Sequence, residues 1–168
     1  MSATVRRAWA LNFDAGDELA RGAGHNAPRS MRARAHDLVG RLGSLVPPGD
    51  VVVVPAPLAG PPPDATGLVG VAWCPTPSAL AALRAAGAAP VASPPQDVLR
   101  RVTHRRFGIE LGASLEGARW VSDLEAIEAA IAASASPTGR WLLKRPFGYA
   151  GRGRLAIEAA LGPADRAW

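Results

Sequence analysis

The sequence is poor in cysteine, lysine and aromatic residues, and each shortage argues against a class of function. Its one cysteine, Cys74, can form neither an internal disulfide nor a zinc site built from cysteines. Aromatic residues make up 5% of the 168 residues, and the net charge of +5 comes without lysine clusters. The charge favours an anionic ligand, but this composition does not predict a nucleic-acid partner.

Long apolar runs are also missing. No stretch reaches the length of a membrane span, and residues 6–14 contain no signal-peptide core. We therefore expect a cytoplasmic protein with no membrane partner. His25, His36 and His104 are scattered, with no metal-site spacing and no partnered carboxylate expected, and no serine stands in a G-x-S-x-G pattern.

What the sequence does contain is an alternation of strand and helix patterns. Periodicity and turn residues predict strands at 7–13, 51–54, 68–73, 90–93 and 119–122, and helices at 29–45, 78–86, 95–102, 104–113 and 123–133. Residues 12–18 and 20–28 are interpreted as a polar turn and a loop. Short connections between alternating elements predict an α/β fold with a mostly parallel sheet flanked by helices.

Two polar segments follow predicted strands, where α/β folds place ligand sites. These are Asn12-Phe13-Asp14 and Ala72-Trp73-Cys74-Pro75. They are hypothetical contacts to a substrate, although loop polarity alone would also explain them.

Residues 140–154 carry the strongest chemical signal. A short apolar run ends in Lys144, the only lysine of the chain, and is followed by Gly148, Gly151, Gly153 and a second apolar run. This pattern predicts two strands joined by a glycine-rich loop. Glycines let backbone N–H groups approach an anion closely, and a compact ammonium fits among phosphate oxygens. The segment is interpreted as a phosphate site or, alternatively, as an ordinary solvated hairpin.

The glycine spacing, G-x-x-G-x-G, matches neither the P-loop nor the dinucleotide-binding fingerprint. It resembles the glycine-rich hairpin of the ATP-grasp ligases, in which a strand ends in a nucleotide-binding lysine and a loop covers the ATP phosphates. Leu142-Leu143-Lys144-Arg145-Pro146 matches the strand end. The resemblance implies that ATP is bound by Lys144, Gly148, Tyr149, Ala150, Gly151, Arg152 and Gly153.

A second segment, Val102-Thr103-His104-Arg105-Arg106-Phe107, is similar to the family's first basic phosphate-binding element. It has Arg105 where the family usually has lysine. The resemblance adds Arg105 to the expected ATP site. The alternative is that these charges form a solvated helix face.

The resemblance implies a Rossmann-like pre-ATP-grasp domain at 1–115 and an incomplete ATP-grasp-like α+β segment at 116–168. The implied activity is ATP-dependent ligation of a carboxylate to an amine or thiol, with Mg²⁺. Glu158 and Asp165 are the only acidic residues after the glycine loop, so the Mg²⁺ ligands are expected outside this chain. The chain alone is therefore not expected to be catalytic. The acceptor substrate cannot be identified from the sequence.

Two alternatives remain at this point. The chain could be a non-catalytic α/β module that pairs through open strand edges, as a homo-oligomer. It could also be a Rossmann-like domain for another anionic ligand.

Overall fold

A computed structural model describes residues 5–22, 25–55, 60–134, 136, 138–148, 153–158 and 160–168. The chain divides into two compact units, Met1–Leu99 (unit 1) and Arg100–Trp168 (unit 2). The boundary expected between residues 115 and 116 falls inside unit 2, and as a division between two domains it stays a prediction.

Unit 1 contains a parallel four-stranded sheet. Its strands are β1 (Arg7–Ala10), β2 (Val51–Val53), β3 (Val69–Ala72) and β4 (Ala89–Pro90), in the order β2-β1-β3-β4. The predicted α/β fold with a parallel sheet is confirmed here, and the arrangement is Rossmann-like. The chain leaves β1 toward β2 on one side and continues from β3 to β4 on the other, so the strand order reverses between β1 and β3.

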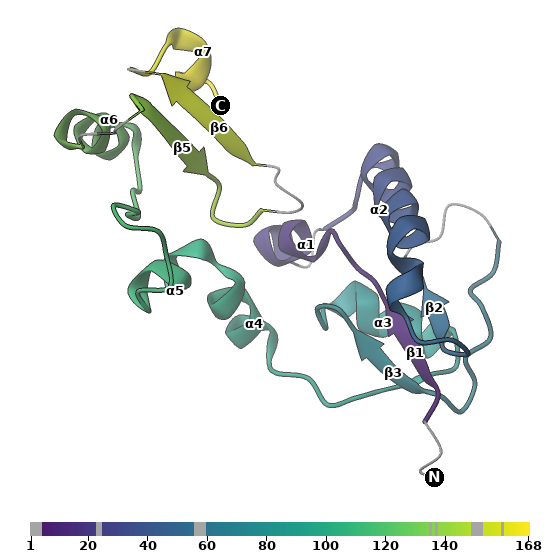
Figure 1. Cartoon of the computed structure of the whole chain (residues 1–168). Coiled ribbons are helices and arrows are strands. Elements are labelled where there is room, and N and C mark those ends of the chain that lie inside the picture. Colours follow the sequence, from purple (N-terminus) through teal and green to yellow (C-terminus); the bar gives the residue numbers. More distant parts are fainter. Residues whose placement is uncertain are drawn as a thin grey trace. The chain divides into compact units, whose positions relative to one another are not determined.

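Helices flank this sheet. The connection from β1 to β2 contains α1 (Ala15–Arg21), α2 (Arg29–Leu42) and the 3₁₀ turn η2 (Gly43–Leu45), whereas α3 (Pro77–Ala85) joins β3 to β4. Helices α2 and α3 lie on opposite sides of the sheet (Figure 1), as right-handed crossovers running in opposite directions require. Helix α4 (Gln96–Thr103) follows β4.

The core of unit 1 is built mainly from small side chains. Its buried cluster contains Leu83 and Val53 together with the alanines Ala8, Ala10, Ala65, Ala79, Ala86 and Ala88. Alanine buries little apolar surface, so the helices must approach the sheet closely. Gly70 in β3 allows this, because a Cβ there would lie 3.2 Å from a methyl group of Leu83 and from the backbone of Pro90.

A polar contact fixes the start of the β1–β2 pair. The Asp50 carboxylate accepts hydrogen bonds from Trp9 Nε1 (2.7 Å) and from the Arg7 backbone N–H (3.0 Å). The bond from Trp9, followed by that from Arg7, lowers the pKa of Asp50 below its ordinary value. The carboxylate is thus held in its charged, accepting form at neutral pH.

Unit 2 contains a two-stranded antiparallel sheet and short helices. These are α5 (Arg105–Glu110), α6 (Leu124–Ala133), β5 (Arg140–Lys144), β6 (Arg154–Glu158) and α7 (Pro163–Arg166). Asp123 caps α6 by accepting from the Ala126 N–H at 2.8 Å, and an ion pair between Arg166 and Glu128 joins α7 to α6. Figure 1 shows α7 beside the hairpin.

The strand expected at 119–122 is wrong, because these residues form neither strand nor helix. The Trp120 ring instead packs against the ring of His104, with centroids 4.8 Å apart. Across the described residues, no helix combines the length and the apolarity needed to cross a membrane.

Gly87 provides a test of this packing. It follows α3 with φ +84°, and an added Cβ would lie 2.6 Å from Thr66 Oγ1 and 3.1 Å from the Thr66 Cα. Gly67 has a similar φ of +76° but nothing within 4 Å. We expect Gly67→Ala to lower the free energy of unfolding of unit 1 by about 1 kcal/mol through backbone strain. Gly87→Ala should cost a further 1–3 kcal/mol, roughly, through the steric clash.

Urea unfolding followed by the backbone amide signals of unit 1 measures both costs separately from unit 2. Equal losses in the two variants would show that Thr66 moves aside without cost, and the close packing of Gly87 would then not matter for stability.

Candidate functional sites

The hairpin of unit 2 places the only lysine at the end of β5. Strands β5 and β6 pair from Arg140 opposite Glu158 to Lys144 opposite Arg154. Beyond the last pair, the Arg145 N–H donates to the Gly153 carbonyl at 2.7 Å, which closes the base of the loop. The strands predicted on either side of the glycine-rich segment are therefore both present.

The backbone conformation at Gly153 explains why glycine occupies this position. Its φ is +62°, and an added Cβ would lie 3.3 Å from the Cβ of Arg145. Glycine is required there for the turn itself. Gly148 is exposed. The expected loop residues Tyr149, Ala150, Gly151 and Arg152 lie outside the described residues.

Arg105 lies against the same hairpin. Its backbone N–H donates to the Pro146 carbonyl and its Nε to the Arg145 carbonyl, both at 3.0 Å. The preceding residue, His104, also contacts the segment after β5. Its ring makes an edge-on contact with Phe147 at 5.0 Å, and its Nδ1 accepts from the Arg106 N–H. The hydrogen bond from Arg105 Nε to Arg145 joins residues 40 positions apart in sequence, so two distant segments are tied together just after β5.

Lys144 and Arg105 line one open pocket, which we call the hairpin pocket. Its volume is about 720 Å³, within the range of small-molecule sites. The other lining residues are Val102, Thr103, His104, Gly108, Ile109, Gly112, Ala113, Ser114, Leu115 and Ala118. None of these residues is acidic, so the pocket presents two cations and no carboxylate.

Neighbouring charges are neutralised elsewhere. Arg106 pairs with Glu110 one helical turn on, at 2.7 Å, and Arg140 pairs with Glu158 across the hairpin at 2.8 Å. Arg145 donates to the Trp168 carbonyl and lies over the Trp168 ring. Among the residues that the structure describes, none forms a hydrogen bond or ion pair with the Lys144 ammonium.

Metal binding has no support in the described ranges, where no three His, Cys, Asp or Glu side chains come together. The Mg²⁺ of the hypothesis therefore stays a prediction.

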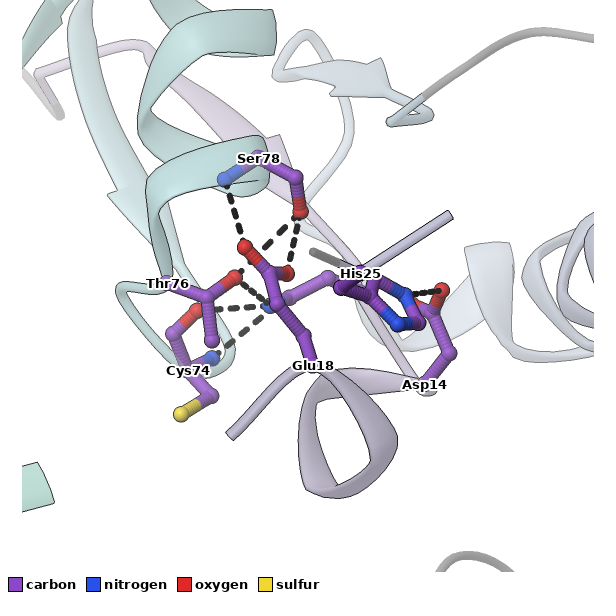
Figure 2. Close-up of polar contacts among 7 residues, drawn as sticks. Asp14, Glu18, His25, Cys74, Thr76 and Ser78 are labelled. Atoms are coloured by element: carbon purple, nitrogen blue, oxygen red, sulfur yellow. Dashed lines mark hydrogen bonds and ion pairs between the residues drawn. The ribbon is translucent and has the colours of Figure 1, made fainter. Parts of the chain in front are cut away.

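A second polar site lies in unit 1, at the carboxyl ends of β1 and β3 (Figure 2). At its centre is Asn12, which is 1% exposed. Its Nδ2 donates to the Cys74 carbonyl (2.7 Å) and to Thr76 Oγ1 (2.9 Å), and its Oδ1 accepts from the Cys74 N–H (3.0 Å). One side chain thus joins the segment after β1 to the segment after β3.

Glu18 of α1 performs a related task. Its buried carboxylate accepts from the Ser78 backbone N–H at 2.8 Å and from the Ser78 hydroxyl, at the first turn of α3 (Figure 2). The carboxylate satisfies one N–H group that the helix itself leaves unpaired.

His25 corrects one expectation. The sequence offered it no carboxylate partner, yet its Nε2 lies 3.5 Å from Asp14 Oδ2, and both side chains are largely buried. Cys74, by contrast, behaves as expected for a packed thiol. Burial, with a smaller contribution from the Glu18 charge, raises the pKa of Cys74, so the thiol stays protonated and poorly nucleophilic at neutral pH.

The sequence pointed to Asn12, Asp14 and Cys74 through their places after predicted strands. It missed Glu18, His25 and Ser78, because they come together only through tertiary contacts. A usable signal was present in Ser78, which stands at the start of a predicted helix, where an acceptor for its N–H must be found.

Asn12 can be tested directly. Asn12→Ala leaves the Cys74 N–H and carbonyl and the Thr76 hydroxyl without their partner in a buried place. We expect a loss of about 2–4 kcal/mol in the free energy of unfolding of unit 1. The control is Asn26→Ala, because Asn26 is exposed, and it should change stability by less than about 0.5 kcal/mol.

Denaturant unfolding of the two variants decides this. A similar small loss in both would show that water replaces the Asn12 hydrogen bonds without cost.

Comparison with models of known protein families, with curated proteins and with solved structures found no match. We therefore argue function from the residues and geometry described above.

Proposed function

We propose that unit 2 binds the phosphate groups of ATP, and that the chain is the N-terminal part of an ATP-grasp-like ligase. Such an enzyme joins a carboxylate to an amine or thiol. The observation that carries the proposal is the meeting of Lys144 with Arg105 in the hairpin pocket, which no acidic residue lines. Both are basic positions for which the resemblance implied phosphate contacts.

The charge pattern along the hairpin supports an anionic ligand. The pair at the open end, Arg140 and Glu158, is complementary. The pair next to the loop, Lys144 and Arg154, consists of two cations directly opposite each other. Like charges in this relation destabilise an antiparallel pair. A bound polyphosphate would remove this repulsion, so the end of the hairpin is better suited to the ligand-bound state than to the free one.

Each residue of the proposed site has a defined task. Lys144 supplies a compact charge to a phosphate oxygen, and the Arg105 guanidinium, anchored through Nε, supplies a second. Gly148 and Gly153 belong to the backbone of the loop, and contacts from Tyr149, Ala150, Gly151 and Arg152 are proposed from sequence alone. ATP would supply the phosphoryl group that activates a carboxylate. This chain would bind and orient the phosphates.

A second candidate function is self-association. Within the described residues each strand of the hairpin has one unpaired edge, and Leu142 is 49% exposed on its face. A two-stranded sheet is marginal alone and gains from pairing with another edge.

The first test is calorimetric titration with ATP and with tripolyphosphate. We expect both ligands to bind with a dissociation constant of about 0.1–5 mM. Added salt should weaken this binding, because it screens the charges. Lys144→Ala and Arg105→Ala should each weaken binding by about tenfold or more, because each removes a charge-assisted contact. The matched control is Arg106→Ala, since Arg106 is neutralised by Glu110 on the same helix and should change affinity by less than about twofold.

Equal losses in all three variants would reduce the effect to net charge and contradict a specific site. No binding by the wild-type chain, together with a stable oligomer in size analysis, would favour the association module.

The variant Arg154→Glu distinguishes an effect on phosphate binding from an effect on the stability of the hairpin. It turns the like-charged pair with Lys144 into a complementary one, so the hairpin should become more stable by about 0.2–1 kcal/mol. The same change places a carboxylate opposite Lys144 and should abolish polyphosphate binding. Amide hydrogen exchange in β5 and the ATP titration measure the two effects. A variant that is more stable and still binds ATP would exclude the end of the hairpin as the phosphate site.

A further inference from the structure

Unit 1 contains a cavity that the nucleotide proposal does not use. It has a volume of about 130 Å³ and is lined by residues that follow β1 and β2, by the first turn of α3 and by α2. We call it the sheet-edge cavity. Its polar lining includes Asn12, Asp14, His25, Asn26, Arg32 and Ser78. Because these residues follow β1 or begin α3, which comes after β3, the cavity lies beside the point where the strand order reverses. This point is the usual place of ligands in open α/β sheets.

The cavity is lined by buried polar atoms without partners. The His25 side chain is only 8% exposed, and neither its Nδ1 nor its Nε2 forms a hydrogen bond. The approach of Nε2 to Asp14 Oδ2, at 3.5 Å, is an ion-pair distance but too long for a good hydrogen bond. Buried nitrogens in this state cost free energy, and a native protein normally satisfies them.

Arg32 of α2 adds a cation to the same wall. Its Nε is buried and has no hydrogen-bond partner, and no ion pair joins its guanidinium to a carboxylate in the described part of the chain. Its neighbour Arg34, by contrast, is exposed on the same helix. An Arg Nε and a His ring whose buried nitrogens make no hydrogen bond, at one small cavity, are suited to a carboxylate, which can accept from both.

The remaining charges define the other end of the ligand. The Glu18 carboxylate is occupied by the two Ser78 donors. Among the described residues, the Asp14 carboxylate, at 15% side-chain exposure, makes only the loose contact with His25. The Asp14 carboxylate can only accept hydrogen bonds, and it lies beside Arg32 and His25, which suit a carboxylate of the ligand. A ligand that fits all three residues therefore also carries a hydrogen-bond donor, either an ammonium or a hydroxyl group.

We propose that the sheet-edge cavity binds a small α-amino or α-hydroxy acid. Its carboxylate pairs with Arg32 and His25, and its amino or hydroxyl group donates to Asp14. The volume corresponds to about four waters, which limits the ligand to roughly five or six non-hydrogen atoms. The site lies wholly in unit 1 and does not depend on nucleotide binding by unit 2.

The test uses the whole chain without nucleotide. Glycine, glycolate, acetate and methylamine are titrated separately while the NMR signals of the His25 ring and of the α2 amides are followed. Glycine or glycolate should bind with a dissociation constant of about 1–10 mM. Acetate, which lacks the donor, and methylamine, which lacks the carboxylate, should each bind at least fivefold more weakly.

Variants assign the contacts. Arg32→Met should weaken binding of the better ligand at least tenfold, whereas Arg34→Met, on the same helix, should change it less than twofold. Asp14→Asn should remove any preference of glycine over acetate. If Arg32→Met does not fold, Arg32→Lys keeps the charge but loses the Nε donor, and it should still weaken binding at least threefold.

Several results would overturn the proposal. One is the absence of any shift of the His25 signals with all four molecules at 50 mM, roughly five or more times the expected constant, which would show that water satisfies the cavity. The others are equal weakening by the Arg32 and Arg34 variants, or acetate binding as well as glycine. ATP binding through Lys144 is measured separately, so either site can fail without the other.

Discussion

The side-chain amide of Asn12 is the contact on which the arrangement of loops at the carboxyl ends of β1 and β3 depends. Parallel strands are hydrogen-bonded along their length, but the loops that leave their carboxyl ends have no such partner. The Asn12 side chain forms hydrogen bonds with the backbone N–H and the carbonyl of Cys74 and with the Thr76 hydroxyl. It thus holds the loop after β3 against the end of β1. With that loop in place, the first turn of α3 meets the Glu18 carboxylate, and the wall of the sheet-edge cavity is complete.

The composition of the core explains why polar contacts carry this weight. Six of the eight residues in the buried core cluster of unit 1 are alanines, which bury little apolar surface and place few constraints on neighbouring loops. Small side chains allow close approach, as at Gly70 and Leu83, but they do not fix the direction in which a loop leaves a strand. Buried hydrogen bonds do, since an unsatisfied partner is costly.

Local patterns predicted most of the fold. The β-branched run became β2 and the Ala/Leu periodicity became α3, because both patterns agree with the tertiary structure. Residues 119–122 look like a strand but find no pairing partner, and Trp120 packs on His104 instead. Helix α1 lies where the sequence predicts a polar turn and a loop, because its seven residues are too few to show a clear period. The carboxylate partner of His25 was missed for a different reason: residues 14 and 25 are brought together only by the path of the chain after α1.

The two sites differ in the balance of charge, and this difference separates their ligands. At the hairpin pocket, every lining charge is positive, and the opposing Lys144 and Arg154 leave repulsion that only an anion of more than one charge relieves well. At the sheet-edge cavity, Arg32 is accompanied by Asp14, so a polyphosphate would meet repulsion as well as attraction. The cavity, at about 130 Å³, is also small for a nucleotide. The placement of the carboxylates therefore decides which kind of ligand we propose for each site, a polyanion at the hairpin pocket and a small molecule with both an acidic and a donor group at the sheet-edge cavity.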